Sequence, residues 1–226
     1  LMRTPKFTVR RSALPVRVMV LICLLAAVAI AQPTADSPKR TVFLDHEGRE
    51  ITNDEFVDIR MANFHYPDRT LIRTLEDGTT EFRLQKVPQE GIQVPDVSFQ
   101  TVDRRRITMS ELRGKVVVLN FWFIGCPVCL AHKPKLNELR SKFADNDSVV
   151  FLAATADTAA DVRKFLAKER FDYLQAVDAD TALKKFVFSG YPKNIVIGKT
   201  GEVVYWRSTI AAWGKFESVI SSELRK

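Results

Sequence analysis

The sequence predicts an α/β protein in which buried strands alternate with amphipathic helices, preceded along the chain by a smaller unit. Residues 116–122 form an apolar run with a single asparagine, which is typical of a central strand covered on both faces. Similar runs recur at 149–153 and 195–197, and residues 159–169 carry apolar side chains on one helical face. This alternation predicts a sheet with helices packed against it.

The other elements of this α/β domain, which we place at residues 94–226, follow from shorter patterns. A helix is expected after the strand at 116–122 and should end near residue 143. The remaining predictions are strands at 97–102, 107–108, 174–177 and 203–206 and helices at 181–186 and 216–224.

An accessory unit is predicted at residues 41–87, separated from the larger domain by a linker that contains proline. Residues 42–44 favour a strand, and Thr52 is a typical cap at the start of a helix. Asp77-Gly78 lies between two strand-forming segments and is a strong signal for a β-hairpin. The unit carries no group of residues that we connect with chemistry, so we expect it to serve in packing or partner contact.

Residues 1–31 have the composition of a secretory signal peptide. Five basic and no acidic residues precede an apolar run at 18–31, which ends in Ala-x-Ala. Cleavage is expected after Ala31, with residues 32–40 as a polar tether and the mature protein in the periplasm. The alternative is an uncleaved leader that anchors the protein in the membrane, facing away from the cytosol, although a spanning helix needs about 20 apolar residues.

The net charge of +7 belongs to this leader rather than to the rest of the chain. Without residues 1–31, the chain has 29 basic and 27 acidic residues. A basic surface that attracts a phosphate backbone is therefore not expected, and no nucleic-acid partner is predicted.

Two of the three cysteines remain once the leader is removed. Cys23 lies in the leader, so the mature chain can form one internal disulfide, which can persist outside the cytosol. Cys126 follows the strand at 116–122 and opens a helix, whose unpaired N–H groups favour a thiolate. Cys129 lies one turn further on the same face. We therefore assign Cys126 as the exposed nucleophile and Cys129 as the resolving thiol.

Three other interpretations of this pair compete with redox chemistry, and the last of them fails. An inert disulfide would close a loop of only four residues and stabilise the fold by about 2 kcal/mol. A zinc site lacks a second Cys-x-x-Cys, and only His132 has a suitable spacing. Haem attachment needs a histidine directly after the second cysteine, where the chain has Leu130. Neither a metal nor another cofactor is therefore expected.

Four motifs follow one another within residues 94–224. They are the segment 114–122, the pair Cys126 and Cys129, Pro134, and Gly-Tyr-Pro at 190–192. Together they resemble a thioredoxin fold and, more narrowly, the TlpA/ResA-like family of exported thiol–disulfide oxidoreductases. The resemblance implies that the two cysteines alternate between a disulfide and a dithiol.

The resemblance also implies that Tyr191 and Pro192 bind substrate. Thioredoxin-like proteins hold a cis proline opposite the dithiol, and Pro192 occupies that place, with Tyr191 beside the mixed disulfide. The alternatives are an ordinary trans turn at Pro192 and a packing role for Tyr191.

Three positions differ from common thioredoxin patterns. Gly125 stands where relatives commonly have Trp, which removes an apolar surface beside the nucleophile. His132 stands where many have Glu, three residues after Cys129. It is a possible proton acceptor, a stabiliser of the thiolate when charged, or simply an exposed polar residue. Asn120, where cytosolic thioredoxins carry an acid, is expected to be a hydrogen-bonded core residue.

The predicted function is reduction of protein disulfides outside the cytosol, with the direction taken from the family resemblance. Expected substrates are cysteines of proteins under maturation, such as cytochrome c apoproteins, and a membrane thiol donor would re-reduce the protein. One alternative is a copper-binding or metal-delivery protein that uses Cys126, Cys129 and a histidine. Another, a peroxide-reducing enzyme, is disfavoured because relatives of that type use a differently placed cysteine.

Overall fold

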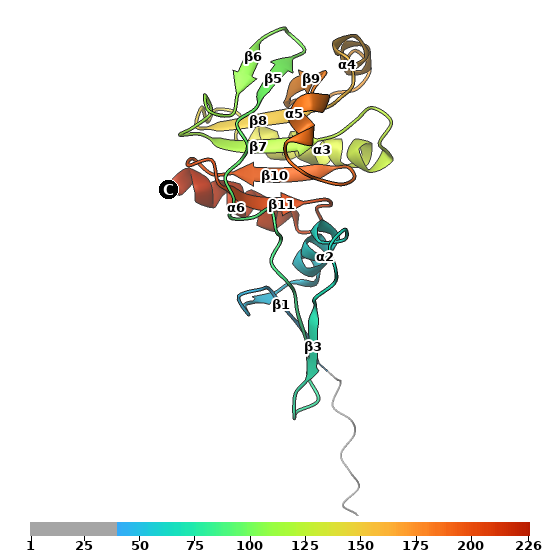
Figure 1. The fold of residues 1–226 in the computed structure, drawn as a ribbon, viewed down its shortest axis with the longest axis vertical. Helices are drawn as coiled ribbons and strands as arrows, with labels where there is room; N and C mark the ends of the chain where they lie inside the picture. Colours follow the sequence, from blue (N-terminus) through green and yellow to red (C-terminus); the bar gives the residue numbers. More distant parts are fainter. Residues whose placement is uncertain (1–39) are drawn as a thin grey trace, which may run out of the picture. The chain divides into compact units, whose positions relative to one another are not determined.

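The computed structural model describes residues 40–226, the coloured part of Figure 1. The predicted leader at 1–31, its cleavage after Ala31 and the tether at 32–40, apart from Arg40, lie outside these residues. Within the described part, no helix is both long and apolar enough to cross a membrane.

The larger part of the structure is built on a seven-stranded mixed sheet in the order β11-β10-β7-β8-β9-β5-β6. Strands β7, β8 and β9 run parallel, whereas β10, β11, β5 and β6 are joined in antiparallel pairs. The strands are β5 (Ser98–Thr101), β6 (Arg106–Thr108), β7 (Val116–Phe121), β8 (Val149–Ala154), β9 (Leu174–Val177), β10 (Lys193–Ile197) and β11 (Val203–Arg207). This is the predicted thioredoxin-like α/β fold.

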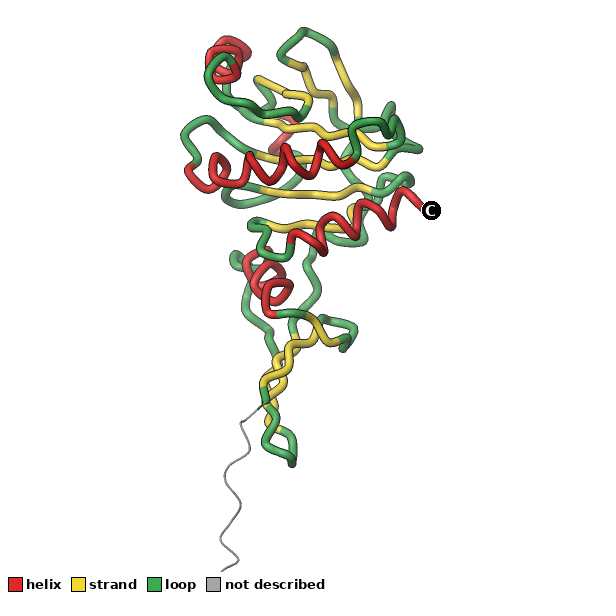
Figure 2. Tube along the Cα trace, turned by 180° about the vertical axis from the view of Figure 1, so that it is seen from behind, coloured by secondary structure: helices red, strands yellow, loops and turns green. Residues whose placement is uncertain are grey.

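Helices cover both faces of this sheet. They are α3 (Pro127–Lys142), α4 (Ala159–Leu166), α5 (Asp180–Lys184) and α6 (Trp213–Arg225). Figure 2 shows α3 and α6 on the same face. Every residue of β7 is buried, and its side chains alternate between two hydrophobic clusters: Val117, Leu119 and Phe121 belong to one, and Val116 and Val118 to the other.

Two helices differ in length from the sequence-based predictions, whereas the other boundaries in this sheet and its helices agree within two residues. Helix α4 ends at Leu166 rather than 169, and α6 begins at Trp213 rather than 216. The early start of α6 has no local signal, because Ala212, the residue before it, has no side chain that can cap the helix.

The accessory unit contains a second sheet, in the order β2-β1-β4-β3, and one helix. Its elements are β1 (Thr41–Leu44), β2 (Glu50–Ile51), α2 (Asn53–Ala62), β3 (Leu71–Thr74) and β4 (Thr80–Arg83). Thr52 caps α2 in a capping box with Glu55, as its sequence context predicts. The rings of Phe43, Phe56 and Phe82 pack together, with centroids 4.3 to 6.2 Å apart.

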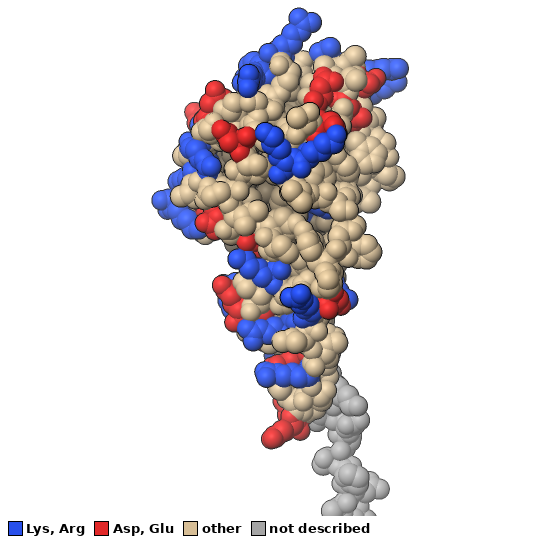
Figure 3. Space-filling model, in the orientation of Figure 1, with Lys and Arg blue, Asp and Glu red and all other residues tan. Residues whose placement is uncertain are grey.

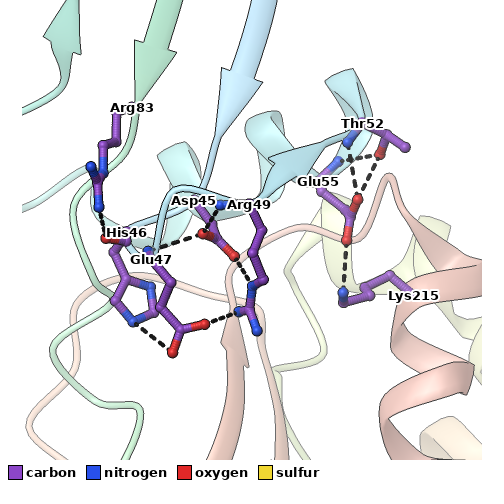
Figure 4. Close-up of polar contacts among 8 residues, drawn as sticks. All are labelled: Asp45, His46, Glu47, Arg49, Thr52, Glu55, Arg83 and Lys215. Carbon is purple, nitrogen blue, oxygen red and sulfur yellow. Dashed lines mark hydrogen bonds and ion pairs between the residues drawn. The ribbon is translucent and has the colours of Figure 1, made fainter.

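The turn between β1 and β2 is held by Asp45, whose carboxylate accepts the N–H groups of Glu47 and Arg49 at 2.9 Å each (Figure 4). On the same side of the unit, Glu55 of α2 forms an ion pair with Lys215 of α6, at 3.0 Å between the oxygen and Nζ. The accessory unit thus contacts α6, the last helix that packs against the seven-stranded sheet.

Strand β11 lies at an edge of the seven-stranded sheet, and that edge is occupied. Helix α2 contacts β11. In the linker, the Gly91 N–H donates to the Val203 carbonyl at 2.8 Å, and the Val203 N–H donates to Ile92 at 2.9 Å. An edge that is paired and covered in this way does not offer its backbone to other chains.

Lysine and arginine side chains are interspersed with aspartate and glutamate on the face that Figure 3 displays. A face of mixed sign does not concentrate positive potential.

Candidate redox site

The structure brings Cys126 and Cys129 together as a disulfide, with a Cα–Cα distance of 5.2 Å. Cys126 is the cap residue of α3, and Pro127 occupies the first helical position, where its missing N–H leaves no hydrogen bond unmade. The Cys126 Sγ accepts the Cys129 N–H at 3.1 Å. An orphan N–H at the helix start therefore points at this sulfur, which favours negative charge on it when the bond is reduced.

The expectation that Cys126 is exposed is wrong for this disulfide form. Cys126 is 4% exposed and Cys129 is 3% exposed, because both belong to the hydrophobic cluster that α3 and α6 form against the sheet. Exposed apolar side chains stand next to the pair in sequence, Phe123 before it and Val128 within it. A partner that reaches the sulfurs therefore meets an apolar surface around them.

Gly125 does not leave the surface beside Cys126 bare. The ring of Phe123 lies 3.4 Å from the position that a Cβ of Gly125 would occupy. Phe123 in turn contacts Tyr191 edge-to-face, with ring centroids 5.3 Å apart. Phe123, two positions before Gly125, thus supplies an apolar surface beside the cysteine loop.

The Tyr191–Pro192 peptide is cis, as the family resemblance implies, and the trans alternative is wrong. Pro192 is buried and directly precedes β10. Because Lys193 pairs with Phe121 in antiparallel register, Pro192 lies at the end of β7 from which the cysteine loop departs.

Tyr191 is half-buried, and its ring packs against Phe123 on one side and Phe188 on the other, each at 5.3 Å between centroids. Burial raises the pKa of its hydroxyl. Tyr191 therefore packs, as one interpretation predicts, and its contact with Phe123 also places it beside the cysteine loop. Its contact with substrate stays a prediction.

His132 is half-buried rather than exposed. Its ring stands edge-on to Trp213 of α6 at 5.8 Å, and its Nδ1 is buried without a hydrogen-bond partner within the described residues. Burial lowers the pKa of His132, against an opposing effect of the Asp58 carboxylate. In this disulfide form, burial thus favours the uncharged imidazole, and the part that His132 plays with the cysteines stays a prediction.

Asn120 is a hydrogen-bonded core residue, as predicted. Its Nδ2 donates to Asn194 Oδ1 at 2.9 Å and to the Lys193 carbonyl at 3.3 Å. These bonds tie β7 to β10 across the strand pair that carries the cysteine loop and Pro192.

Asp157, which follows β8, is a residue of the site that the sequence alone did not point to. Its Oδ2 accepts the Ile124 N–H at 2.8 Å and the Thr155 hydroxyl at 2.7 Å. Because Ile124 lies two residues before Cys126, this carboxylate holds the cysteine loop against the end of the sheet. An acidic residue just after a buried strand is the signal that could have identified it.

Lys193, a buried lysine directly after Pro192, is a second residue that was not predicted. It is 4% exposed, and its Nζ donates to Ser208 Oγ at 2.8 Å. Burial disfavours the ammonium and lowers the pKa of Lys193 to about 8. A charged residue at the start of an apolar strand was the available signal.

Among residues 40–226, no three His, Cys, Asp or Glu side chains are grouped so that they could hold a metal ion. His46 and His65 are exposed residues of the accessory unit.

A protein-family model described as Redoxin matches residues 89–212, a range that includes Cys126, Cys129 and Pro192 and more than half of the chain. The chain belongs to the Redoxin family. With this membership and its Cys126–Cys129 disulfide, it is a thiol–disulfide oxidoreductase.

Known relatives are distant in sequence. The thioredoxin-like protein YneN of Bacillus subtilis is 26% identical over 117 residues, which cover 51% of this chain and 69% of that protein. The thiol-disulfide oxidoreductase ResA of Bacillus cereus is 26% identical over 117 residues, or 51% and 68% of the two chains. These relatives agree with the ResA-like resemblance seen in the sequence.

Solved structures include a similar fold. A putative protein disulfide isomerase from Bacteroides thetaiotaomicron has a TM-score of 0.55 and 26% sequence identity. The match covers 61% of this chain and 91% of the other.

Replacing Asp157 with alanine should destabilise the oxidised protein by about 1–3 kcal/mol, because the partly buried Ile124 N–H and the Thr155 hydroxyl lose a charged acceptor. Urea denaturation of Asp157→Ala measures this loss. The matched control is Asp145→Ala, which removes an exposed carboxylate. Equal midpoints for the two variants would contradict the role of Asp157.

Lys193 predicts a specific pH dependence of stability. Its pKa is about 8 in the folded protein and about 10.4 in an unfolded chain, so the folded state binds fewer protons between these values. The free energy of unfolding should therefore rise with pH from about 8 to 10 through this group. Urea denaturation across that range should show a smaller rise in Lys193→Met than in wild type, and parallel curves would count against the burial argument.

Proposed function

We propose that this protein is an exported reductase of protein disulfides that works through Cys126 and Cys129. The observation that carries the proposal is the disulfide at the start of α3, at the same end of the sheet as the cis proline Pro192. Family membership supports thiol–disulfide exchange, and the apolar side chains of Phe123 and Tyr191 beside the pair suit a protein substrate.

In the first step, the Cys126 thiolate attacks one sulfur of a substrate disulfide. A bond forms between Cys126 Sγ and that sulfur, the substrate S–S bond breaks, and the other substrate sulfur leaves as a thiolate. The positive end of α3 stabilises the attacking thiolate.

In the second step, Cys129 loses its proton and attacks Cys126 Sγ. The Cys126–Cys129 bond forms, the mixed disulfide breaks, and the second substrate thiolate is released. The substrate gains two electrons and the protein is left in the disulfide form. We assign His132 as the group that accepts the Cys129 proton, because it lies three residues away on the same helix and burial lowers the pKa of its imidazole.

The proposed site of action and partners rest on the sequence of the leader and on the resemblance to exported oxidoreductases seen in the sequence. We place the protein in the periplasm, with cleavage after Ala31, or anchored by its leader with residues 40–226 outside the cytosol. A membrane thiol donor returns the disulfide to the dithiol. Cysteines of maturing proteins, such as cytochrome c apoproteins, are the proposed substrates.

Cys129→Ser should accumulate a mixed disulfide with substrate, because the second attack is removed while the nucleophile remains. Non-reducing gel electrophoresis with a disulfide-containing protein detects the adduct, which dithiothreitol should release. The matched control, Cys126→Ser, should form far less adduct. Equal trapping by both variants would overturn the assignment of Cys126 as the nucleophile.

The direction of electron flow is tested by equilibrating the Cys126–Cys129 pair with glutathione buffers. A reduction potential of about −270 mV is expected for a reductant. A value of about −120 mV would instead make the protein an oxidant. Stoichiometric Cu(I) binding without disulfide reductase activity would instead favour the copper-handling alternative.

A further inference from the structure

Asp58 is a buried carboxylate of the accessory unit, outside the residues that the Redoxin family matches. It lies on α2 and is 1% exposed. A buried carboxylate is costly unless its oxygens accept hydrogen bonds, so its partners indicate what it does.

All its hydrogen bonds come from the loop between β11 and α6. Oδ1 accepts the Ala211 N–H at 2.8 Å and the Thr209 hydroxyl at 3.3 Å, and Oδ2 accepts the Ala212 N–H at 3.0 Å. Ala212 is the cap residue of α6 and has no capping side chain of its own. Asp58 therefore supplies acceptors, and a negative charge, at the start of a helix 154 residues away in the chain.

The loop that Asp58 holds reaches the redox site. Ile210, which is 4% exposed, belongs to the same hydrophobic cluster as Cys126 and Cys129. Trp213, the first residue of α6, packs edge-on against His132. The hydrogen bonds of Asp58 thus end within one or two residues of Ile210, which shares the hydrophobic cluster of the disulfide, and of Trp213, which packs on His132.

Asp58 also acts on His132 through charge, since its carboxylate raises the pKa of the imidazole against the effect of burial. The pKa of Asp58 itself is raised by burial, with the loop hydrogen bonds and the charge of Arg207 opposing the rise. The other titratable groups that line the cavity beside this carboxylate are Asp45, His46, Arg49, Glu55, Glu90, Tyr205 and Lys215.

We propose that Asp58 is a positioning residue of the redox site, through which α2 sets the β11–α6 loop against the disulfide and His132. The inference deepens the proposed function, on which it rests, by making the accessory unit a working part of the same site. Asp58 does not touch the sulfurs; it acts through Ile210, Trp213 and His132.

The test compares Asp58→Asn with a matched control, Glu55→Gln. Asparagine keeps the shape of Asp58 but removes its charge and presents an NH₂ group to N–H donors. Glu55→Gln weakens the other polar link between α2 and α6, the ion pair with Lys215 in Figure 4, without touching the loop. A purely structural role for α2 predicts similar effects of both changes.

Three measurements on the protein alone separate these outcomes. In Asp58→Asn, amide exchange at Ala211 and Ala212 should be at least tenfold faster, and the NMR titration midpoint of His132 should fall. Iodoacetamide should alkylate reduced Cys126 at least threefold faster. Glu55→Gln should leave all three near wild type.

Equal changes in the two variants, or a loss of stability in Asp58→Asn with an unchanged His132 midpoint, would overturn the inference. If Asp58→Asn does not fold, Asp58→Glu keeps the charge but displaces the carboxylate. It should accelerate exchange at Ala211 and Ala212, and unchanged exchange would refute the positioning role. Since no substrate enters these measurements, failure of the wild type to reduce protein disulfides would reject the proposed function separately.

Discussion

The antiparallel pairing of β7 with β10 is the constraint on which the redox site depends. Every residue of β7 is buried between two layers, so a shift of register by one residue would turn its whole apolar set to the wrong face. In the observed register Phe121 lies opposite Lys193, and the Asn120–Asn194 hydrogen bond links the next pair. The cysteine loop and the cis-proline loop therefore leave the sheet at the same end.

Burial is the common physical cause behind the electrostatics of this site. Cys126 and Cys129 are buried in the cluster on one face of the seven-stranded sheet, and His132 is half-buried beside Trp213 on that face. Lys193 is buried on the opposite face. Both basic groups lose hydration, and both have lowered pKa values. The buried carboxylate of Asp58, in contrast, has defined partners, because the N–H groups of the β11–α6 loop donate to it.

The accessory unit covers strand β11, which is the edge of the seven-stranded sheet nearer to the redox site. Its helix α2 covers β11, and its carboxylate at Asp58 completes the start of α6. The sequence of this unit predicted packing or partner contact and no chemistry. In the tertiary structure, Asp58 of this unit binds the loop that carries Ile210. The packing of the accessory unit therefore also positions a loop of the redox site.

The sequence by itself determined the elements and the reactive pair, because both arise from interactions over a few residues. Apolar periodicity placed the strands and helices, the Thr52–Glu55 box started α2, and the spacing of Cys126 and Cys129 allowed a bond within one turn. Only the tertiary structure decided that Cys126 is buried and that Asp58 caps α6. These features depend on contacts between segments far apart in the chain, where no local pattern records which side chains meet.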